Sequence, residues 1–337
     1  AQDTVPLRRT FRKSLMLVFI AACLSCATAT DAPAPEELRA LLREGCVSSS
    51  ADGVDQPVLF YAPREARGPV PLLVSLHSWS TTYDKYGSLD PALAACVERG
   101  WAFVSPHFRG PNDRPEACGS DLAVQDVRDA VAYAKEQTRI DADRLYLVGV
   151  SGGGHMALVM AHRAPELWAA VSAWVPITDI ARWHAFSKGA GRKYAKDIEG
   201  VLGGPPDTPG RIAEARKRSP LFHLEDARGL PIDIQAGIHD GHDGNSVPID
   251  HTLRAFNVLA RANGYADAVL TQADIAYMTR KASVPQHLAE EREEEPGREH
   301  PVLFRRSAGP VRVTLFDGPH TGEIEAAVAW LAEHERR

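Results

Sequence analysis

Strand-like apolar runs alternate with helical patterns along most of this chain. The predicted strands are short and almost wholly apolar, and they cover residues 71–77, 102–106, 145–150, 169–175, 232–238 and 311–316. Apolar residues at helical spacing predict helices over residues 122–137, 152–163, 247–263 and 321–335. Strands that are apolar on both faces need cover on both faces. The pattern therefore predicts an α/β fold, with a mostly parallel sheet and helices on both of its faces.

Two stretches interrupt the alternation, and both are longer than ordinary connections. Residues 177–230 are irregular, whereas residues 266–310 are rich in charge and contain a run of glutamates. We expect both to be insertions on one sheet, with the glutamates on a solvated surface, because their spacing is not that of a calcium loop. No repeat or Gly/Pro-rich linker divides the rest. One catalytic domain is therefore predicted over 58–337, after an N-terminal extension over 30–57.

The first residues have the order of an export signal rather than of a folded element. A basic cluster over 8–13 precedes an apolar run over 15–24 and then small residues. Residues 27–29 (Ala-Thr-Ala) fit a cleavage site, whereas residues 20–23 resemble a bacterial lipobox that would make Cys23 a lipid-anchored first residue. We predict that residues 1–29 are an export signal or lipoprotein leader. The protein is then an exported bacterial protein that is periplasmic, secreted or lipid-anchored.

Composition excludes several classes of protein. The chain has 337 residues, of which 44% are hydrophobic, so it can fill a core and is not expected to be disordered. Its formal net charge is −6, and its leader is basic, so the body is more acidic still and no nucleic-acid partner is expected. No apolar run reaches the ~18 residues of a membrane-spanning helix. Membrane contact is expected only through the possible lipid anchor at Cys23.

Cysteine usage argues against a disulfide framework. Five cysteines are present, and Cys46, Cys96 and Cys118 would remain after removal of the leader. Cys96 lies in an apolar helical pattern and is expected to be buried. Cys46 and Cys118 could form a disulfide in an oxidising compartment.

A G-x-S-x-G motif centred on Ser151 lies between a predicted buried strand and a predicted helix. This context is the one that a nucleophile elbow requires, because the chain must turn sharply to project the serine hydroxyl above the sheet. A serine hydroxyl is a weak nucleophile until a neighbouring base takes its proton. His320, between the last strand and the last helix, is the predicted base.

The predicted acid follows the preceding strand, where two carboxylates are available. Asp240 comes directly after the strand and is our first choice, and Asp243 is the alternative. Either could orient His320 and stabilise its imidazolium form. His239 and His242 beside these acids could also suggest a metal site, but a single H-x-x-H in a loop is a weak signal. We expect no metal and no cofactor.

Acyl transfer also needs donors directed at the developing oxyanion. The backbone N–H of Gly152, which follows the nucleophile, is the first expected donor. The second should come from Ser78 or Trp79, in the loop after the strand over 71–77. We favour Trp79, whose indole could also bind substrate as a wall of an acyl pocket.

These residues together resemble the α/β-hydrolase superfamily. Within it they are similar to the prolyl-oligopeptidase-like and dienelactone-hydrolase-like branch, which includes acetyl-xylan-type esterases. The likeness covers about residues 58–336 and rests on the order Ser151, then Asp240 or Asp243, then His320. Further similar segments are 104–110, 141–145 and 247–248.

The resemblance also bears on two loops. His77-Ser78 stands where this branch usually has His-Gly in the oxyanion loop. Arg109, in the segment similar to the branch's strand-then-Arg-Gly motif, is expected either to bind substrate or to form a structural salt bridge.

The resemblance implies a cofactor-free Ser-His-Asp hydrolase with the α/β-hydrolase fold. We predict an exported serine hydrolase that forms an acyl-enzyme and cleaves carboxylic esters of a small molecule or a polymer. The alternative is a peptidase or amidase that uses the same residues. Prolyl oligopeptidases carry an N-terminal propeller, and the short stretch 30–57 leads us to expect none here. A non-catalytic surface lipoprotein is a third hypothesis, which the complete triad disfavours.

Overall fold

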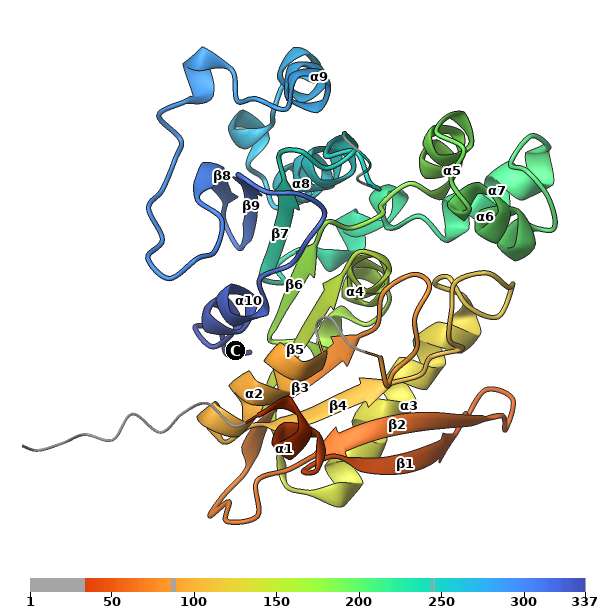
Figure 1. Ribbon diagram of the computed structural model, residues 1–337, viewed down its shortest axis with the longest axis vertical. Helices are drawn as coiled ribbons and strands as arrows, with labels where there is room; N and C mark the ends of the chain where they lie inside the picture. The colour runs from red at the N-terminus through yellow and green to blue at the C-terminus, as the bar shows by residue number, and fades with distance from the viewer. Residues whose placement is uncertain (1–33, 86–88, 243, 245, 337) are drawn as a thin grey trace, which may run out of the picture. The chain divides into compact units, whose positions relative to one another are not determined.

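The computed structural model describes residues 34–85, 89–242, 244 and 246–336. The core of this part of the chain is a nine-stranded sheet. In spatial order its strands are β1 (Arg43–Ser48), β2 (Asp55–Tyr61), β4 (Ala102–Pro106), β3 (Val70–Leu76), β5 (Ile140–Val150), β6 (Ala170–Trp174), β7 (Ile232–Gly237), β9 (Val311–Phe316) and β8 (Val302–Ala308) (Figure 1). The strands from β4 to β9 in this order run parallel, whereas β2 and β8 are antiparallel to their neighbours. The predicted mostly parallel sheet is confirmed.

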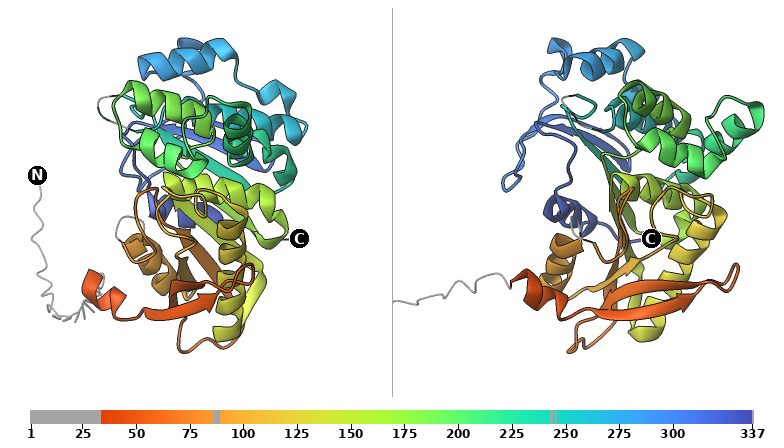
Figure 2. Two further views of the ribbon diagram at one scale, coloured as in Figure 1. Left: turned by 90° about the vertical axis from the view of Figure 1, so that its right-hand side faces the viewer. Right: turned by 45° about the vertical axis from the view of Figure 1, so that its right-hand side comes forward.

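Helices cover both faces of the sheet, as the sequence pattern predicts. They are α1 (Pro35–Arg39), α2 (Leu89–Arg99), α3 (Asp121–Gln137), α4 (Gly152–Arg163), α5 (Ile180–Gly189), α6 (Tyr194–Leu202), α7 (Pro209–Lys217), α8 (Asp250–Ala262), α9 (Gln272–Lys281) and α10 (Ile324–Leu331). The helices α2 and α10 pack together on one face, and α3, α4 and α8 lie on the other (Figure 2). Strands β3, β4 and β6 are buried at every position, which is expected for strands covered on both sides.

The face of β7 and β9 that looks toward α10 is polar. On β7, Asp233 and Gln235 alternate with buried isoleucines, and on β9, Arg312 and Thr314 alternate with buried valines. The Arg312 guanidinium lies over the ring of Trp330 in α10, which identifies the face. The sequence pattern predicted strands apolar on both sides here, and the structure corrects it. This part of the sheet needs polar cover on one face.

The two stretches that we expected to be insertions form helices and, in the second, one further strand. Residues 177–230 form α5, α6 and α7 around an apolar cluster that includes Trp183. The second insertion begins with a short 3₁₀ helix (Ala266–Ala268), continues with α9 and a charged segment, and ends in β8. Because β8 pairs with β9, residues 302–308 belong to the sheet rather than to an insertion. Similarly, β1 and β2 place residues 43–57 of the predicted extension in the sheet.

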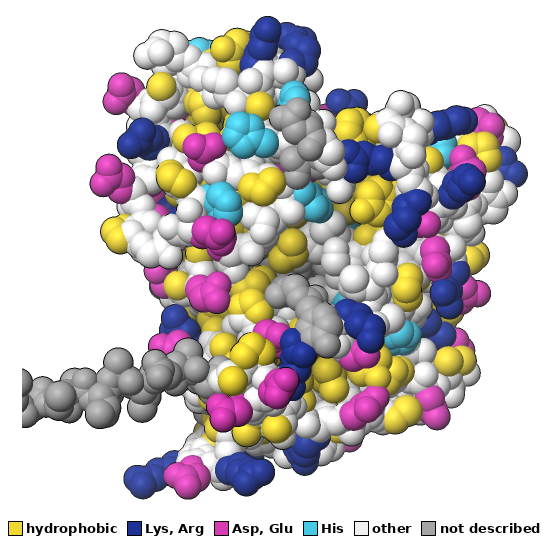
Figure 3. All heavy atoms as spheres, viewed as in Figure 1, with side chains coloured by type: hydrophobic (Ala, Val, Ile, Leu, Met, Phe, Trp, Pro, Cys, Tyr) yellow, Lys and Arg dark blue, Asp and Glu magenta, His cyan; other side chains and the backbone are white. Residues whose placement is uncertain are grey.

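The predicted leader, with Cys23, lies outside the described residues. No helix in the described part of the chain is long and apolar enough to cross a membrane. Acidic and basic side chains are intermixed on the face seen in Figure 3. Cys46, Cys96 and Cys118 are free thiols, with Cys46 exposed and Cys118 buried. The Cys46–Cys118 disulfide that the sequence left possible is therefore not formed.

Arg109 links the loop after β4 to two distant elements. Its guanidinium donates to both carboxylate oxygens of Asp52, at 2.8 and 2.9 Å, and to both of Asp126 in α3, at 2.6 and 3.1 Å. Its backbone amide donates to the side chain of Gln56 at 3.1 Å. With its guanidinium engaged by two carboxylates, Arg109 has the structural role that the sequence left open, and the expectation that it binds substrate is not supported.

The substitution Arg109→Met separates these two roles. It leaves the carboxylate of Asp126, which is 0% exposed, buried without its partner. We expect a loss of about 3 kcal/mol in the free energy of unfolding, measured by urea denaturation. The exposed pair of Arg114 and Asp113 provides the control, because Arg114→Met should cost less than about 1 kcal/mol. A substrate role would instead raise KM in the folded variant without a loss of stability.

Candidate active site

Ser151 lies in the sharp turn between a strand and a helix. The strand β5 ends at Val150 and α4 begins at Gly152, so Ser151 alone makes the turn. Its backbone has φ 60° and ψ −115°, and a positive φ is strained for a residue with a side chain. The Ser151 amide donates to the carbonyl of Trp174, at the end of β6, at 2.8 Å. The predicted strand–turn–helix context of the G-x-S-x-G motif is confirmed.

The glycines around Ser151 are required by close backbone contacts. A Cβ atom on Gly149 would lie 2.1 Å from the carbonyl oxygen of Gly153, and one on Gly153 would lie 2.2 Å from that of Leu76. A Cβ on Gly152 would lie 2.3 Å from the backbone nitrogen of Trp79. These distances are far below van der Waals contact, so only glycine fits at these three positions.

The structure brings Ser151, His320 and Asp240 together. His320 Nε2 lies 2.9 Å from Ser151 Oγ, and His320 Nδ1 lies 2.6 Å from Asp240 Oδ2. A neutral imidazole protonated on Nδ1 fits both contacts, because it donates to the Asp240 carboxylate and accepts the Ser151 hydroxyl proton at Nε2. The three residues follow β5, β7 and β9. The carboxyl ends of these parallel strands meet at one edge of the sheet, where open α/β sheets bind ligands.

Asp240 is held as an oriented carboxylate. It is buried, and its Oδ1 accepts the backbone amides of Gly241 at 3.0 Å and Val247 at 2.9 Å, while Oδ2 faces His320. Both oxygens of the side chain therefore have partners, which fixes the direction in which Asp240 faces His320. The alternative acid, Asp243, lies outside the described residues. The described geometry therefore favours Asp240 as the partner of His320.

The backbone amides of Gly152 and Trp79 are placed side by side. Gly152 lies directly against the Trp79 backbone, and neither amide has a hydrogen-bond acceptor among the described residues. This arrangement suits a pair of oxyanion donors. The carbonyl of Ser78 accepts hydrogen bonds from Thr81, and Ser78 contributes to the wall of the cavity.

The indole of Trp79 is engaged away from the reacting atoms. Trp79 is 2% exposed, its Nε1 donates to Asp197 of α6 at 3.2 Å, and its ring meets that of Trp183 edge-on at 4.7 Å. The side chain therefore anchors the oxyanion loop to the first insertion. Trp79 also lines the cavity above Ser151, so the role of its side chain as a wall of an acyl pocket stays a prediction.

A cavity of about 430 Å³ opens above Ser151. Its walls come from the oxyanion loop, from the His320 loop and from the first insertion. Residues that the sequence did not single out are Tyr83 and Lys85, which follow the oxyanion loop, and Tyr194 at the start of α6. No catalytic motif marks these positions. Tyr194 reaches the cavity only through the folded insertion, whereas Tyr83 and Lys85 reach it through the loop after β3.

No functional role was predicted for His77 from the sequence. One ring nitrogen lies 3.0 Å from the Ser78 carbonyl and the other 2.8 Å from that of His107, and the ring stacks on Phe108 at 4.0 Å. Burial lowers the pKa of His77 to about 4. The ring is therefore neutral near pH 7 and donates to one of the two carbonyls. It joins the oxyanion loop to the loop after β4.

Comparison with known proteins identifies the family. A family model described as the prolyl oligopeptidase family matches residues 88–275, which is more than half of the chain. This chain belongs to the prolyl oligopeptidase family. Two curated relatives are the uncharacterized peptidases y4qF and y4sO of Sinorhizobium fredii (strain NBRC 101917 / NGR234). They are 27% identical over 208 residues and 25% identical over 209 residues.

The chain spans only part of these relatives. The alignments cover 58% of this chain but 27% of y4qF and 29% of y4sO. Among solved structures, an acylaminoacyl peptidase of Pyrococcus horikoshii has a TM-score of 0.54 at 18% identity, over 66% of this chain and 35% of its own. A post-proline cleaving enzyme of Rickettsia typhi has a TM-score of 0.53 at 20% identity, over 66% of this chain and 32% of its own.

These comparisons establish the family and the fold. The fold is that of an α/β-hydrolase, as the resemblance implied. Among the described residues, no three metal-ligating side chains gather into a site. His239 pairs with Asp317 at 3.1 Å, and His242 lies 2.7 Å from the Thr279 carbonyl.

The substitution Gly152→Ala tests the oxyanion geometry. The new methyl group must displace the Trp79 amide, so we expect kcat to fall by about 100-fold while KM changes little. Steady-state kinetics on a chromogenic substrate give both constants. Gly210→Ala in α7 is the matched control, because a Cβ there meets no atom within 4 Å, and it should retain wild-type activity. Wild-type kcat in Gly152→Ala would rule out this donor pair.

Proposed function

We propose that the protein is a serine peptidase that hydrolyses amide bonds of short peptide or acyl-amino substrates. The observation that carries the proposal is the placement of His320 between Ser151 and Asp240, at 2.9 and 2.6 Å. Membership of the prolyl oligopeptidase family and the peptidase names of the relatives support an amide rather than an ester as the natural bond. This choice departs from the carboxylic ester that we expected from sequence.

The first half of the reaction follows from the site. As Ser151 Oγ attacks the carbonyl carbon, its proton passes to His320 Nε2, and the oxyanion accepts hydrogen bonds from the Gly152 and Trp79 amides. Asp240 stabilises the imidazolium that forms. His320 then gives this proton to the leaving amine, the C–N bond breaks, and the acyl group remains on Ser151.

The second half regenerates the enzyme. A water molecule loses a proton to His320 Nε2 and attacks the acyl carbon, which again places negative charge in the oxyanion site. Collapse of this intermediate breaks the bond to Ser151 Oγ, which recovers its proton from His320. The acid product leaves, and each group returns to its starting protonation state.

Ester hydrolysis is a second candidate, which the cavity favours. Its volume of about 430 Å³ is at the small end of the range of ligand sites and suits a compact acyl group. The same residues cleave an ester without change of roles, since an alcohol replaces the amine as leaving group.

We retain export by residues 1–29, with lipidation of Cys23 as one route, as a proposal that rests on the sequence pattern alone.

A substrate panel distinguishes the two bonds. Purified protein and its Ser151→Ala variant are compared on blocked proline and non-proline peptide anilides, nitrophenyl esters and acetylated sugars. We expect wild-type turnover of at least one peptide anilide to exceed that of Ser151→Ala by more than about 1000-fold. Turnover of acetylated sugars without any anilide turnover would show that the esterase alternative is correct. Equal activity in wild type and Ser151→Ala on every substrate would remove both candidates.

A further inference from the structure

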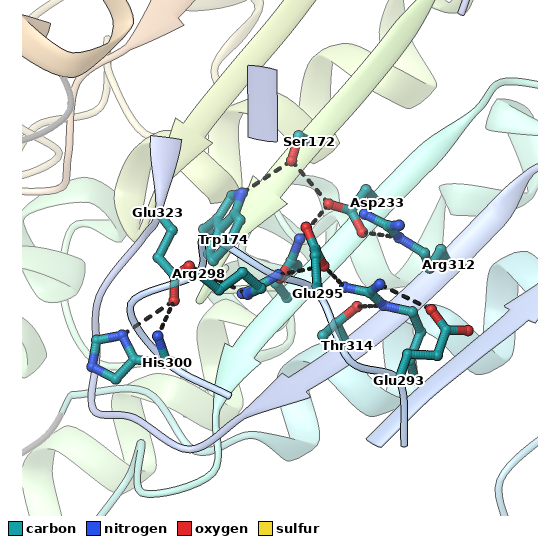
Figure 4. A network of polar contacts seen from close by, with 12 residues as sticks. Ser172, Trp174, Asp233, Glu293, Glu295, Arg298, His300, Arg312, Thr314 and Glu323 are labelled. Carbon is teal, nitrogen blue, oxygen red and sulfur yellow. Dashed lines mark hydrogen bonds and ion pairs between the residues drawn. The ribbon is translucent and has the colours of Figure 1, made fainter. Parts of the chain in front are cut away.

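The polar face of β7 and β9 is covered by the charged segment of the second insertion, and Arg298 is its most buried member. The Arg298 side chain is 2% exposed. Its guanidinium donates to Gln235 Oε1 on β7 at 2.9 Å and pairs with Glu295 at 3.3 Å and with Glu323 at 3.2 Å. It also lies over the aromatic ring of Trp174, 5.2 Å from its centroid. Figure 4 shows Arg298 at the centre of this network.

The partners of Arg298 bracket the loop that carries His320. Phe316, the last residue of β9, directly precedes the loop, and its ring lies under the Arg298 guanidinium at 5.6 Å. Glu323 directly follows the loop and precedes α10. The six residues between these two points include His320, so a single guanidinium contacts both ends of the loop.

His300 repeats this double contact. Its backbone amide donates to Glu323 Oε1 at 3.1 Å, and its ring Nδ1 lies 3.1 Å from the same oxygen (Figure 4). Its ring also packs on that of Phe316 at 5.6 Å. The next residue, Pro301, accepts the backbone amide of Asp317 at 2.8 Å. Residues 298–301 therefore hold the His320 loop at its start and at its end.

The same network reaches the nucleophile from the other side. Trp174, which lies beneath Arg298, accepts the Ser151 amide through its backbone carbonyl at 2.8 Å. Gly322 of the His320 loop packs on β5, since a Cβ there would lie 2.6 Å from the Val150 side chain. One buried guanidinium, that of Arg298, is thus connected through direct contacts to the loop of the base and to the residue that binds the amide of the nucleophile.

We propose that Arg298 and Glu323 are positioning residues that set the distance from His320 Nε2 to Ser151 Oγ. The proposal rests on the proposed function, in that it requires Ser151 and His320 to carry out the hydrolysis. Loss of Arg298 would leave Glu323 buried and without its cationic partner, a state that is relieved only when the loop moves toward water. A shift of the base by about 1 Å can cost about 100-fold in rate.

The rest of the charged segment provides a comparison within the same fold. Arg306 pairs with Glu291, lies over the ring of Phe304 at 5.4 Å and donates to the carbonyl of Ala268 at 3.1 Å. None of these partners belongs to the His320 loop. Arg306→Met therefore removes a half-buried arginine of the same insertion without touching either end of that loop.

The test compares Arg298→Met, Glu323→Gln and Arg306→Met with wild type. The measurements are kcat, KM and the downfield proton resonance of the hydrogen bond from His320 Nδ1 to Asp240. We expect Arg298→Met to lower kcat by about 100-fold with little change in KM, and to broaden or abolish the resonance. Glu323→Gln, which keeps an acceptor for His300, should lose about 10-fold. Arg306→Met should keep kcat within about 2-fold and retain the resonance.

Three outcomes overturn the proposal. They are equal losses of kcat in Arg298→Met and Arg306→Met, a wild-type resonance in Arg298→Met, and wild-type kcat in Glu323→Gln. If Arg298→Met does not fold, the Glu323→Gln variant decides alone. Failure of the proposed function looks different, because Ser151→Ala would then retain activity. When Ser151→Ala is inactive and Arg298→Met is normal, only the positioning role is lost.

Discussion

The strand β5, the helix α4 and the oxyanion loop pack so closely around Ser151 that the neighbouring positions have no space for a side chain. Added Cβ atoms on Gly149, Gly152 and Gly153 would each come within 2.3 Å of a backbone atom, and one on Gly154 would lie 2.7 Å from the Trp174 carbonyl. This crowding presents the hydroxyl outward at a positive φ. It also places the amide of Gly152 against that of Trp79. The nucleophile and the oxyanion donors are therefore consequences of one packing constraint.

The sheet fixes the distances between the loops that carry the three catalytic residues. Ser151, Asp240 and His320 follow strands whose carboxyl ends lie at the same edge, and the neighbouring strands β3, β6 and β7 are buried at every position. A site built on such strands holds its geometry better than one built on loops alone. Asp240 is held by two backbone amides, whereas the His320 loop is held at both ends by side-chain and backbone contacts of residues 298–301. The second insertion thus takes part in the active site without lining its cavity.

Local pattern was enough to predict much of this arrangement. The strand–turn–helix at Ser151 and the ends of β4 and β9 are set by short-range periodicity and by turn residues, which one sequence displays. The edge strands β1 and β8 escaped prediction. The first is largely exposed and carries little apolar pattern, and the second lies inside a charged stretch.

The remaining roles depend on contacts between residues far apart in sequence. As expected, Glu290, Glu293 and Glu294 of the glutamate run are exposed. The run also forms ion pairs that local pattern does not display, because Glu291 pairs with Arg306, and Glu293 and Glu295 pair with Arg305. Burial acts to raise the pKa of Glu295, but Arg305 and Arg298 outweigh it, and the pKa is lowered. The polar residues of β7 and β9 that require such cover are apparent only when the faces of the sheet are known. Asp240 was our first choice over Asp243 only because it directly follows the strand, and the contact of its Oδ2 with His320 is apparent only in the folded chain.

The central claim is that Ser151 is a nucleophile activated by His320 and Asp240, and the rate of modification by a fluorophosphonate tests it most directly. Mass spectrometry identifies the modified residue, and the rate is compared among wild type, Asp240→Asn and Asp243→Asn. The account predicts a single adduct on Ser151, a rate lower by orders of magnitude in Asp240→Asn, and a near-wild-type rate in Asp243→Asn. Modification at another residue, or an Asp240→Asn variant that reacts as fast as wild type, would contradict it.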